Sequence, residues 1–104
     1  MVGLIRDNLN AINGLCKKHH LASLYLVGSA AKETQFNEDS DIDFLYRFNK
    51  DEIELMDYAD NFFDLMFALQ DLLDRKLDLV SEEKMWNPYF IESINESKQL
   101  IYSC

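Results

Sequence analysis

The sequence contains little proline, glycine or cysteine, and each scarcity excludes a class of protein. One proline and three glycines among 104 residues are too few for a low-complexity or disordered chain. No apolar run approaches the roughly 20 residues that cross a bilayer, so we expect no membrane association. The first residues, MVGLIRDNLN, lack the pattern of a signal peptide. Cys16 and Cys104 have no zinc-site spacing, so we expect two free thiols in a reducing cytoplasm.

Positive charge is also scarce, because the formal net charge is -9. A general nucleic-acid-binding surface needs clustered lysine and arginine, so we expect no direct nucleic-acid partner. A local site for metal and phosphate remains compatible with this charge, since bound cations reverse the local sign. Hydrophobic residues make up 48% of the chain, enough for the core of a single domain over residues 1–104.

The apolar patterns predict alternating helices and strands. Residues 3–19 have helical spacing, and the KKHH end, with His19 and His20, is expected to be a solvated helix terminus. The further elements predicted are strands at 22–27, 42–48 and 76–80, a short helix begun by AAKE, helices at 51–75 and 88–97, and an edge strand at QLIY. This order predicts an α/β (α+β) fold, a mixed β-sheet flanked by helices.

Two aspartates stand two residues apart at the start of the strand-like segment SDIDF. Side chains alternate along a strand, so Asp41 and Asp43 share one face while Ile42 and Phe44 point to the other. Asp78 repeats the pattern in KLDLV. If the two strands are neighbours, three carboxylates converge, and their repulsion would be relieved by Mg²⁺. The alternative is an acidic loop that merely begins a strand.

Gly28 and Ser29 close the first predicted strand. A strand that ends in Gly-Ser before a helix exposes backbone N–H groups suited to phosphate oxygens, and glycine allows close approach. Asp39, Asp41 and Asp43 have the spacing of the first acidic residues in a calcium-binding EF-hand loop, but the rest of that loop is missing. Phe44 stands where the loop needs glycine and Lys50 where it needs glutamate.

Together, GS, SDID and KLDLV resemble the nucleotidyltransferase superfamily that includes DNA polymerase beta. More narrowly, the chain is similar to minimal nucleotidyltransferase (MNT) domains, the antitoxin partners of HEPN-domain toxins. The resemblance implies the nucleotidyltransferase fold and transfer of AMP from ATP, with two Mg²⁺ ions, to a tyrosine of the toxin. It implies these roles: nucleotide binding by Gly28, Ser29, Lys32 and Ser40, and metal binding and catalysis by Asp41, Asp43 and Asp78. Asp78 would assist deprotonation of the acceptor hydroxyl.

The sequence departs from the usual G-S-x-A-R-G pattern of this family. It reads GSAAKE, so Lys32 replaces arginine and Glu33 replaces glycine. These changes support a second hypothesis, a non-catalytic antitoxin that neutralises a HEPN toxin by occlusion. A third and weaker hypothesis is nucleotide transfer to a small molecule such as an antibiotic.

The short chain suggests that the acceptor lies on another macromolecule, or that a second subunit completes the site. The helix expected at 51–75 is apolar on more than one stripe. Part of it is therefore a candidate interface for a hetero- or homo-oligomer, with Tyr58, Phe62 or Phe63 in contact with the partner. Trp86 is expected in the core.

Overall fold

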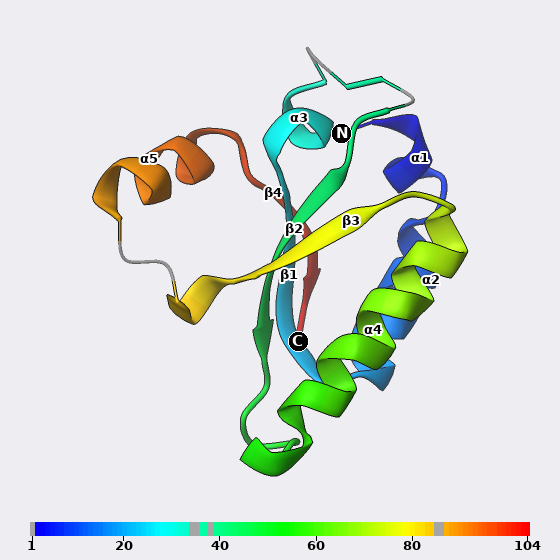
Figure 1. Ribbon diagram of the computed structural model, residues 1–104, viewed down its shortest axis with the longest axis vertical. Helices are drawn as coiled ribbons and strands as arrows, with labels where there is room; N and C mark the ends of the chain where they lie inside the picture. Colours follow the sequence, from blue (N-terminus) through cyan, green and yellow to red (C-terminus); the bar gives the residue numbers. More distant parts are fainter. Residues whose placement is uncertain (1, 34–35, 38, 85–86) are drawn as a thin grey trace.

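The sheet is four-stranded and mixed, as the sequence predicts (Figure 1). A computed structural model describes residues 2–33, 36–37, 39–84 and 87–104. The strands are β1 (Leu21–Val27), β2 (Ile42–Phe48), β3 (Leu77–Ser81) and β4 (Gln99–Ser103). Their order is β3-β2-β1-β4, with β1 antiparallel to β2 and β4, and β2 parallel to β3. The expected terminal edge strand is thus confirmed as β4.

Helices pack against the sheet and around its ends (Figure 1). They are α1 (Gly3–Arg6), α2 (Leu9–Lys18), α3 (Gly28–Lys32), α4 (Tyr58–Leu73) and α5 (Pro88–Ser97), with 3-10 turns at Leu55–Asp57 and Glu82–Lys84. No helix in the described part of the chain combines the length and apolarity that a membrane crossing requires. The prediction for Trp86 lies outside the described residues.

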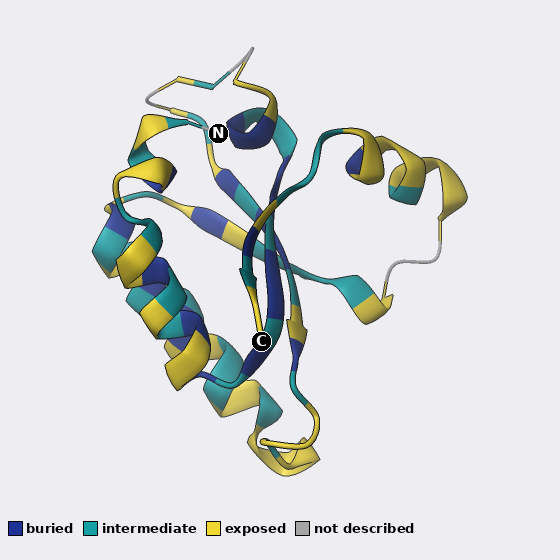
Figure 2. Cartoon of the chain, turned by 180° about the vertical axis from the view of Figure 1, so that it is seen from behind, coloured by how far each residue is buried: buried dark blue, intermediate teal, exposed yellow. Residues whose placement is uncertain are grey.

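Strand alternation divides the apolar side chains between the two faces of the sheet. Phe44 and Leu26 are fully buried in the main core, which α2 and α4 cover with Ile12, Leu65 and other apolar residues. On the opposite face a smaller cluster joins three buried residues, Val27, Leu45 and Ile94. Ile94 is the buried residue of α5, and most of this helix is exposed (Figure 2).

One predicted helix is divided in two and another begins later than expected, and in each case an asparagine side chain binds the backbone near the change. The helix predicted over 3–19 divides into α1 and α2, where Asn8 Nδ2 donates to the Leu4 carbonyl at 2.8 Å. The helix predicted from residue 51 begins only at Tyr58. There the Asp51 N–H donates to Asn49 Oδ1 at 3.1 Å, which holds the segment in a turn.

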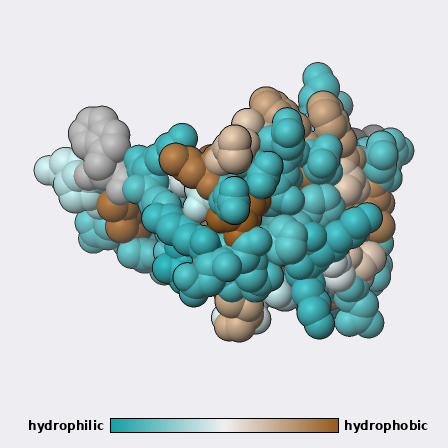
Figure 3. Space-filling model, turned by 90° about the horizontal axis from the view of Figure 1, so that it is seen from below, coloured by the Kyte–Doolittle hydropathy of each residue, from teal (hydrophilic) through white to brown (hydrophobic). Residues whose placement is uncertain are grey.

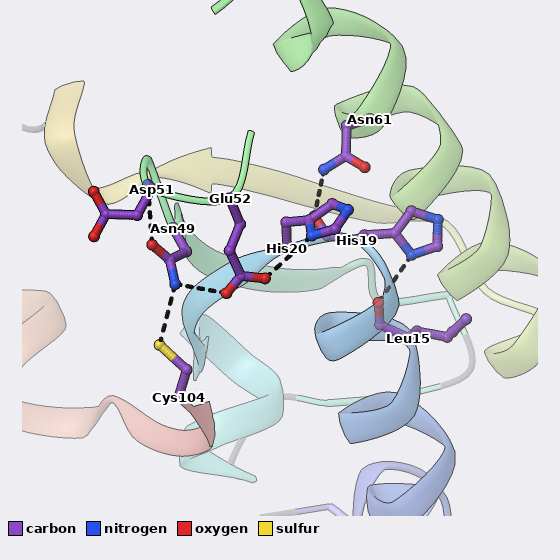
Figure 4. Close-up of polar contacts among 8 residues, drawn as sticks. All are labelled: Leu15, His19, His20, Asn49, Asp51, Glu52, Asn61 and Cys104. Atoms are coloured by element: carbon purple, nitrogen blue, oxygen red, sulfur yellow. Dashed lines mark hydrogen bonds and ion pairs between the residues drawn. The ribbon is translucent and has the colours of Figure 1, made fainter. Parts of the chain in front are cut away.

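The prediction of a solvated histidine pair is wrong for His19. This residue is buried, with Nδ1 2.8 Å from the Leu15 carbonyl. Asn61 of α4 donates to the His19 carbonyl, so α4 covers the turn between α2 and β1 (Figure 4). His20 has a left-handed backbone with φ 63 and contacts Glu52 at 3.2 Å. Propensity alone places both histidines at a helix end, but tertiary packing buries the first.

Both cysteines are free thiols, as the sequence predicts. Cys16 is buried in the main core, and burial raises the pKa of its thiol to about 12. Cys104 is exposed and lies 3.9 Å from Asn49 Nδ2. The core thiol therefore behaves as a small apolar side chain at physiological pH.

Candidate functional site

Gly28 and Asp43 lie against each other at one end of the sheet. Antiparallel pairing places Val27, the last residue of β1, opposite Asp43 of β2. Gly28 then turns the chain into α3 with φ +69, in the left-handed region that favours glycine. A Cβ atom at this position would lie 2.6 Å from Asp43 Oδ2. The sequence predicts that glycine allows a phosphate to approach here; the structure shows that it leaves room for the Asp43 carboxylate.

The three predicted acidic residues occupy the same end of β2 and β3. Asp43 and Asp78 are register partners on these parallel strands, and the exposed Asp41 immediately precedes β2. Partial burial raises the pKa of the Asp43 carboxyl, and the negative charges of Asp78 and Asp41 raise it further. The three carboxylates therefore repel one another in the folded protein.

The three carboxylates are suitable ligands for a divalent cation, but their side chains are not gathered around one point. Within the described residues, no three histidine, cysteine, aspartate or glutamate side chains gather closely enough to hold a metal ion. The oxygen donors of Asp41, Asp43 and Asp78 are nonetheless the type that Mg²⁺ takes. A bound cation would also remove the repulsion that raises the pKa of Asp43.

A cavity of about 290 Å³ opens beside Asp43, between α3, the sheet and α5. Of the residues predicted from the sequence, Gly28, Lys32 and Asp43 line it. Ser29, Ser40, Asp41 and Asp78 are absent from its lining, so the structure brings together only part of the predicted set. The cavity is large enough to hold part of a nucleotide-sized ligand.

One wall of this cavity comes from α5, where the sequence predicts no site residue. Phe90, Ser93, Ile94 and Ser97 line it, and Ile94 also packs into the second apolar cluster. Their spacing of i, i+3, i+4 and i+7 places them on one helical face. Ser93 and Ser97 on this face are the feature of the sequence that could have indicated the wall, because a helix face that only packs against the sheet would be apolar.

Arg75 also lies near the predicted site residues, although no sequence motif indicates it. Its Nη2 donates to the Asn37 carbonyl at 2.7 Å and also to the Ser40 carbonyl, and its guanidinium lies 4.7 Å from the centre of the Phe36 ring. Ser40 Oγ accepts from the Asn37 N–H at 3.0 Å. These contacts hold the loop that leads into Asp41.

Glu33 stands where the usual motif has glycine, and its backbone conformation explains why glycine suits this position. Its φ of 65 lies in the left-handed region, where the glycine of the usual motif has no steric cost. Its carboxylate lies 3.9 Å from Arg6 Nη2, and Glu33 does not line the cavity. The substitution therefore affects the C-terminus of α3, not the cavity wall.

Comparison with known proteins places the chain in a family. Residues 10–101 match the family described as the nucleotidyltransferase domain. A Methanocaldococcus jannaschii protein named "putative protein adenylyltransferase" is 42% identical over 99 residues, covering 94% of this chain and 93% of that protein. A second protein of that organism with the same name is 35% identical over 85 residues, covering 82% of this chain and 79% of its own length.

Solved structures show the same fold. One described as a "putative minimal nucleotidyltransferase" has a TM-score of 0.70 at 30% identity, over 91% of this chain and 90% of that one. A chain from the complex of a tri-AMPylated Shewanella oneidensis HEPN toxin with an MNT antitoxin has a TM-score of 0.62 at 20% identity, over 95% of this chain and 72% of that one. From its domain match and these relatives, the chain belongs to the nucleotidyltransferase domain family.

Proposed function

We propose that this protein transfers AMP from ATP to a hydroxyl group, that of a tyrosine, on a partner HEPN toxin and so acts as its antitoxin. The observation that carries the proposal is the cavity in which Gly28, Lys32 and Asp43 meet α5. Relatives named "putative protein adenylyltransferase", one of them 42% identical to this chain, support the transfer of AMP. The likeness to antitoxin complexes supports the choice of partner.

In this proposal the residues of the cavity and its rim divide the work. The backbone N–H groups of Gly28 and Ser29, with Lys32, bind the phosphates, and Ser40 supports the nucleotide from the loop before β2. Asp41, Asp43 and Asp78 would hold Mg²⁺, as two ions, which when bound neutralises phosphate charge and favours displacement at phosphorus.

The chemical step is an in-line displacement at the α-phosphorus of ATP. The acceptor oxygen forms a bond to that phosphorus, the bond to the bridging oxygen breaks, and pyrophosphate leaves with its electron pair. The proton of the acceptor hydroxyl passes to Asp78, which is exposed and beside Asp43 in register. An exposed carboxylate at an edge strand can be reached by a hydroxyl on another protein.

Intact mass spectrometry tests the proposal. The HEPN protein is incubated with this chain, ATP and Mg²⁺, and it should gain one or more AMP units. The Asp43→Asn variant should give no gain. Transfer that continues in both Asp41→Asn and Asp43→Asn would contradict the roles assigned to these carboxylates.

A second candidate is neutralisation of the toxin by occlusion, without transfer. It is favoured by the absence of a closed cluster of metal-binding side chains among the described residues. It predicts that Asp43→Asn still protects cells from the HEPN toxin. If toxicity returns in that variant while the complex still forms, occlusion is excluded.

A further inference from the structure

A row of aromatic rings runs from the main core to the surface of α4. Ring centres are 5.6 Å apart for Tyr46 and Phe62, 5.2 Å for Phe62 and Phe63, and 6.4 Å for Phe63 and Phe67. The last two rings are 51% and 58% exposed. We call Phe62, Phe63 and Phe67 the aromatic ridge. Aromatic side chains left in water at one place are typical of an interaction surface.

The ridge borders a groove on the face of the sheet that carries the main core. A cavity of about 360 Å³ lies between the start of α4 and the ends of β2 and β3, lined by Tyr46, Phe48, Tyr58 and the inner part of the ridge. Seen from below, apolar side chains reach the surface among hydrophilic ones (Figure 3). Asp43 lies three residues before Tyr46 and points to the other face of β2. The groove is therefore distinct from the candidate nucleotide cavity.

Acidic side chains border the ridge on its other side. A hollow of about 390 Å³ is lined by Glu54, Asp57, Asp60 and Asp64, together with the Glu52–His20 pair. Within the described part of the chain, none of Glu54, Asp57, Asp60 and Asp64 forms an ion pair. On the opposite rim Lys50 neutralises Glu83 at 3.2 Å. The negative charge is thus concentrated on one side of the ridge.

Hydrogen bonds fix this surface in place before any partner binds. Asn61, on the acidic side of α4, donates to the His19 carbonyl. Asn49 Nδ2 donates to Glu52 Oε2 at 2.8 Å, which holds the turn that precedes α4 (Figure 4). A surface that is already ordered loses little conformational entropy on binding.

The geometry points to a docking site for one helix of a protein partner, with an apolar face against the ridge and lysine or arginine along the acidic side. Exposed apolar residues extend from Leu55 and Met56, both 81% exposed, to Phe67. This span of 13 residues is roughly 20 Å, about three and a half helical turns. A ridge along a helix packs naturally into the groove of a second helix.

A second copy of this chain is the less favourable occupant. A two-fold dimer through this surface would bring the acidic sides of both copies, with their Asp60 and Asp64, into one interface. Each chain also carries a net charge of -9. Like charges brought together at an interface oppose association. A basic helix satisfies both the apolar ridge and the acidic side.

The choice of probe rests on the proposed function: the partner tested is the HEPN protein. Its affinity for this chain is measured by titration calorimetry with Phe63→Glu, with the double variant Asp60→Lys and Asp64→Lys, and with Tyr89→Glu as the control. Tyr89 is an aromatic residue of α5, 82% exposed, outside both the groove and the nucleotide cavity. Binding of a fluorescent ATP analogue is measured on every variant, and sedimentation reports the oligomeric state.

We expect Phe63→Glu to weaken HEPN binding about tenfold or more, as for loss of an interface hot spot. The charge-reversal variant should weaken it and reduce its salt dependence. Tyr89→Glu should bind like the parent protein, and nucleotide binding should stay unchanged in all three. Asp43→Asn should bind the HEPN protein normally yet transfer no AMP, so loss of docking and loss of chemistry are distinguished.

Three outcomes would overturn the docking site. The first is unchanged HEPN affinity in both ridge and acidic variants, with transfer intact. The second is an equal loss in Tyr89→Glu. The third is a parent dimer in sedimentation that Phe63→Glu dissociates, because a second copy would then occupy the surface. If the parent protein binds no HEPN protein and stays monomeric, the assignment of a basic helical partner is wrong together with the proposed antitoxin role.

Discussion

Gly28→Ala is the substitution that most directly probes the candidate nucleotide site. Gly28 has φ +69, and an L-residue in this region costs about 1–2 kcal/mol. A chain of this size loses roughly 4–8 °C in Tm for each kcal/mol. We therefore expect the free energy of unfolding to fall by about 1–2 kcal/mol and Tm by about 4–16 °C.

The effect on transfer should be larger than the effect on stability. The new methyl group would lie 2.6 Å from Asp43 Oδ2, so the carboxylate has to rotate away. Rotation of a side-chain terminus adds little to the folding cost, but it moves a group on which the proposed reaction depends. A displacement of about 1 Å in a catalytic group can cost on the order of 100-fold in rate.

Two assays and one control separate these effects. Urea denaturation gives the stability change, and single-turnover AMP transfer, well below Tm, gives the rate. Gly14→Ala is the matched control, because Gly14 is exposed within α2 and has nothing within 4 Å of an added Cβ. It should stabilise the fold by about 0.5–1 kcal/mol and leave transfer unchanged. Parent-like stability and transfer in Gly28→Ala would refute the close approach of Asp43.

Three further predictions concern the same site. Glu33→Gly should raise the unfolding free energy by about 0.5–1 kcal/mol in urea titrations, because glycine accepts φ 65 without strain; a lower value would contradict this reasoning. Asp43→Asn should stabilise the metal-free protein by less than about 1 kcal/mol at neutral pH. Burial, and then the charges of Asp78 and Asp41, raise the folded pKa of Asp43, so the gain should be full above that pKa and vanish below the unfolded carboxyl pKa. A difference in Tm between Asp43→Asn and the parent that stays constant over pH would contradict the raised pKa. Ser93→Trp should fill the cavity and abolish binding of a fluorescent ATP analogue while melting stays near that of the parent, and retained binding would exclude α5 as a wall.

The sequence predicts strands and caps well where the signal is local. Alternation identifies the strand at 42–48, and Phe44 is fully buried as that pattern requires. The Asn87–Pro88 pair marks the start of α5, and Asn87 Oδ1 accepts from the N–H groups of Tyr89 and Phe90. These features depend on a few adjacent residues, so a single sequence is enough.

Features that depend on contacts between segments far apart in the sequence cannot be predicted from local patterns. The contact of Gly28 with Asp43 follows from the register that places Val27 opposite Asp43, and this register appears only when β1 and β2 pair. Arg75 reaches the loop before β2 from the end of α4, 35 residues along the chain from Ser40. The α5 wall likewise depends on how the chain returns over the sheet after β3.

We propose that the cavity beside Asp43 supports AMP transfer to a protein hydroxyl. The most direct measurement is the intact mass of the HEPN protein after incubation with this chain, ATP and Mg²⁺, beside a reaction with the Asp43→Asn variant. We predict a gain of one or more AMP units with the parent chain and none with the variant. A stable complex in which the mass of the HEPN protein never changes would contradict the claim and favour neutralisation by occlusion.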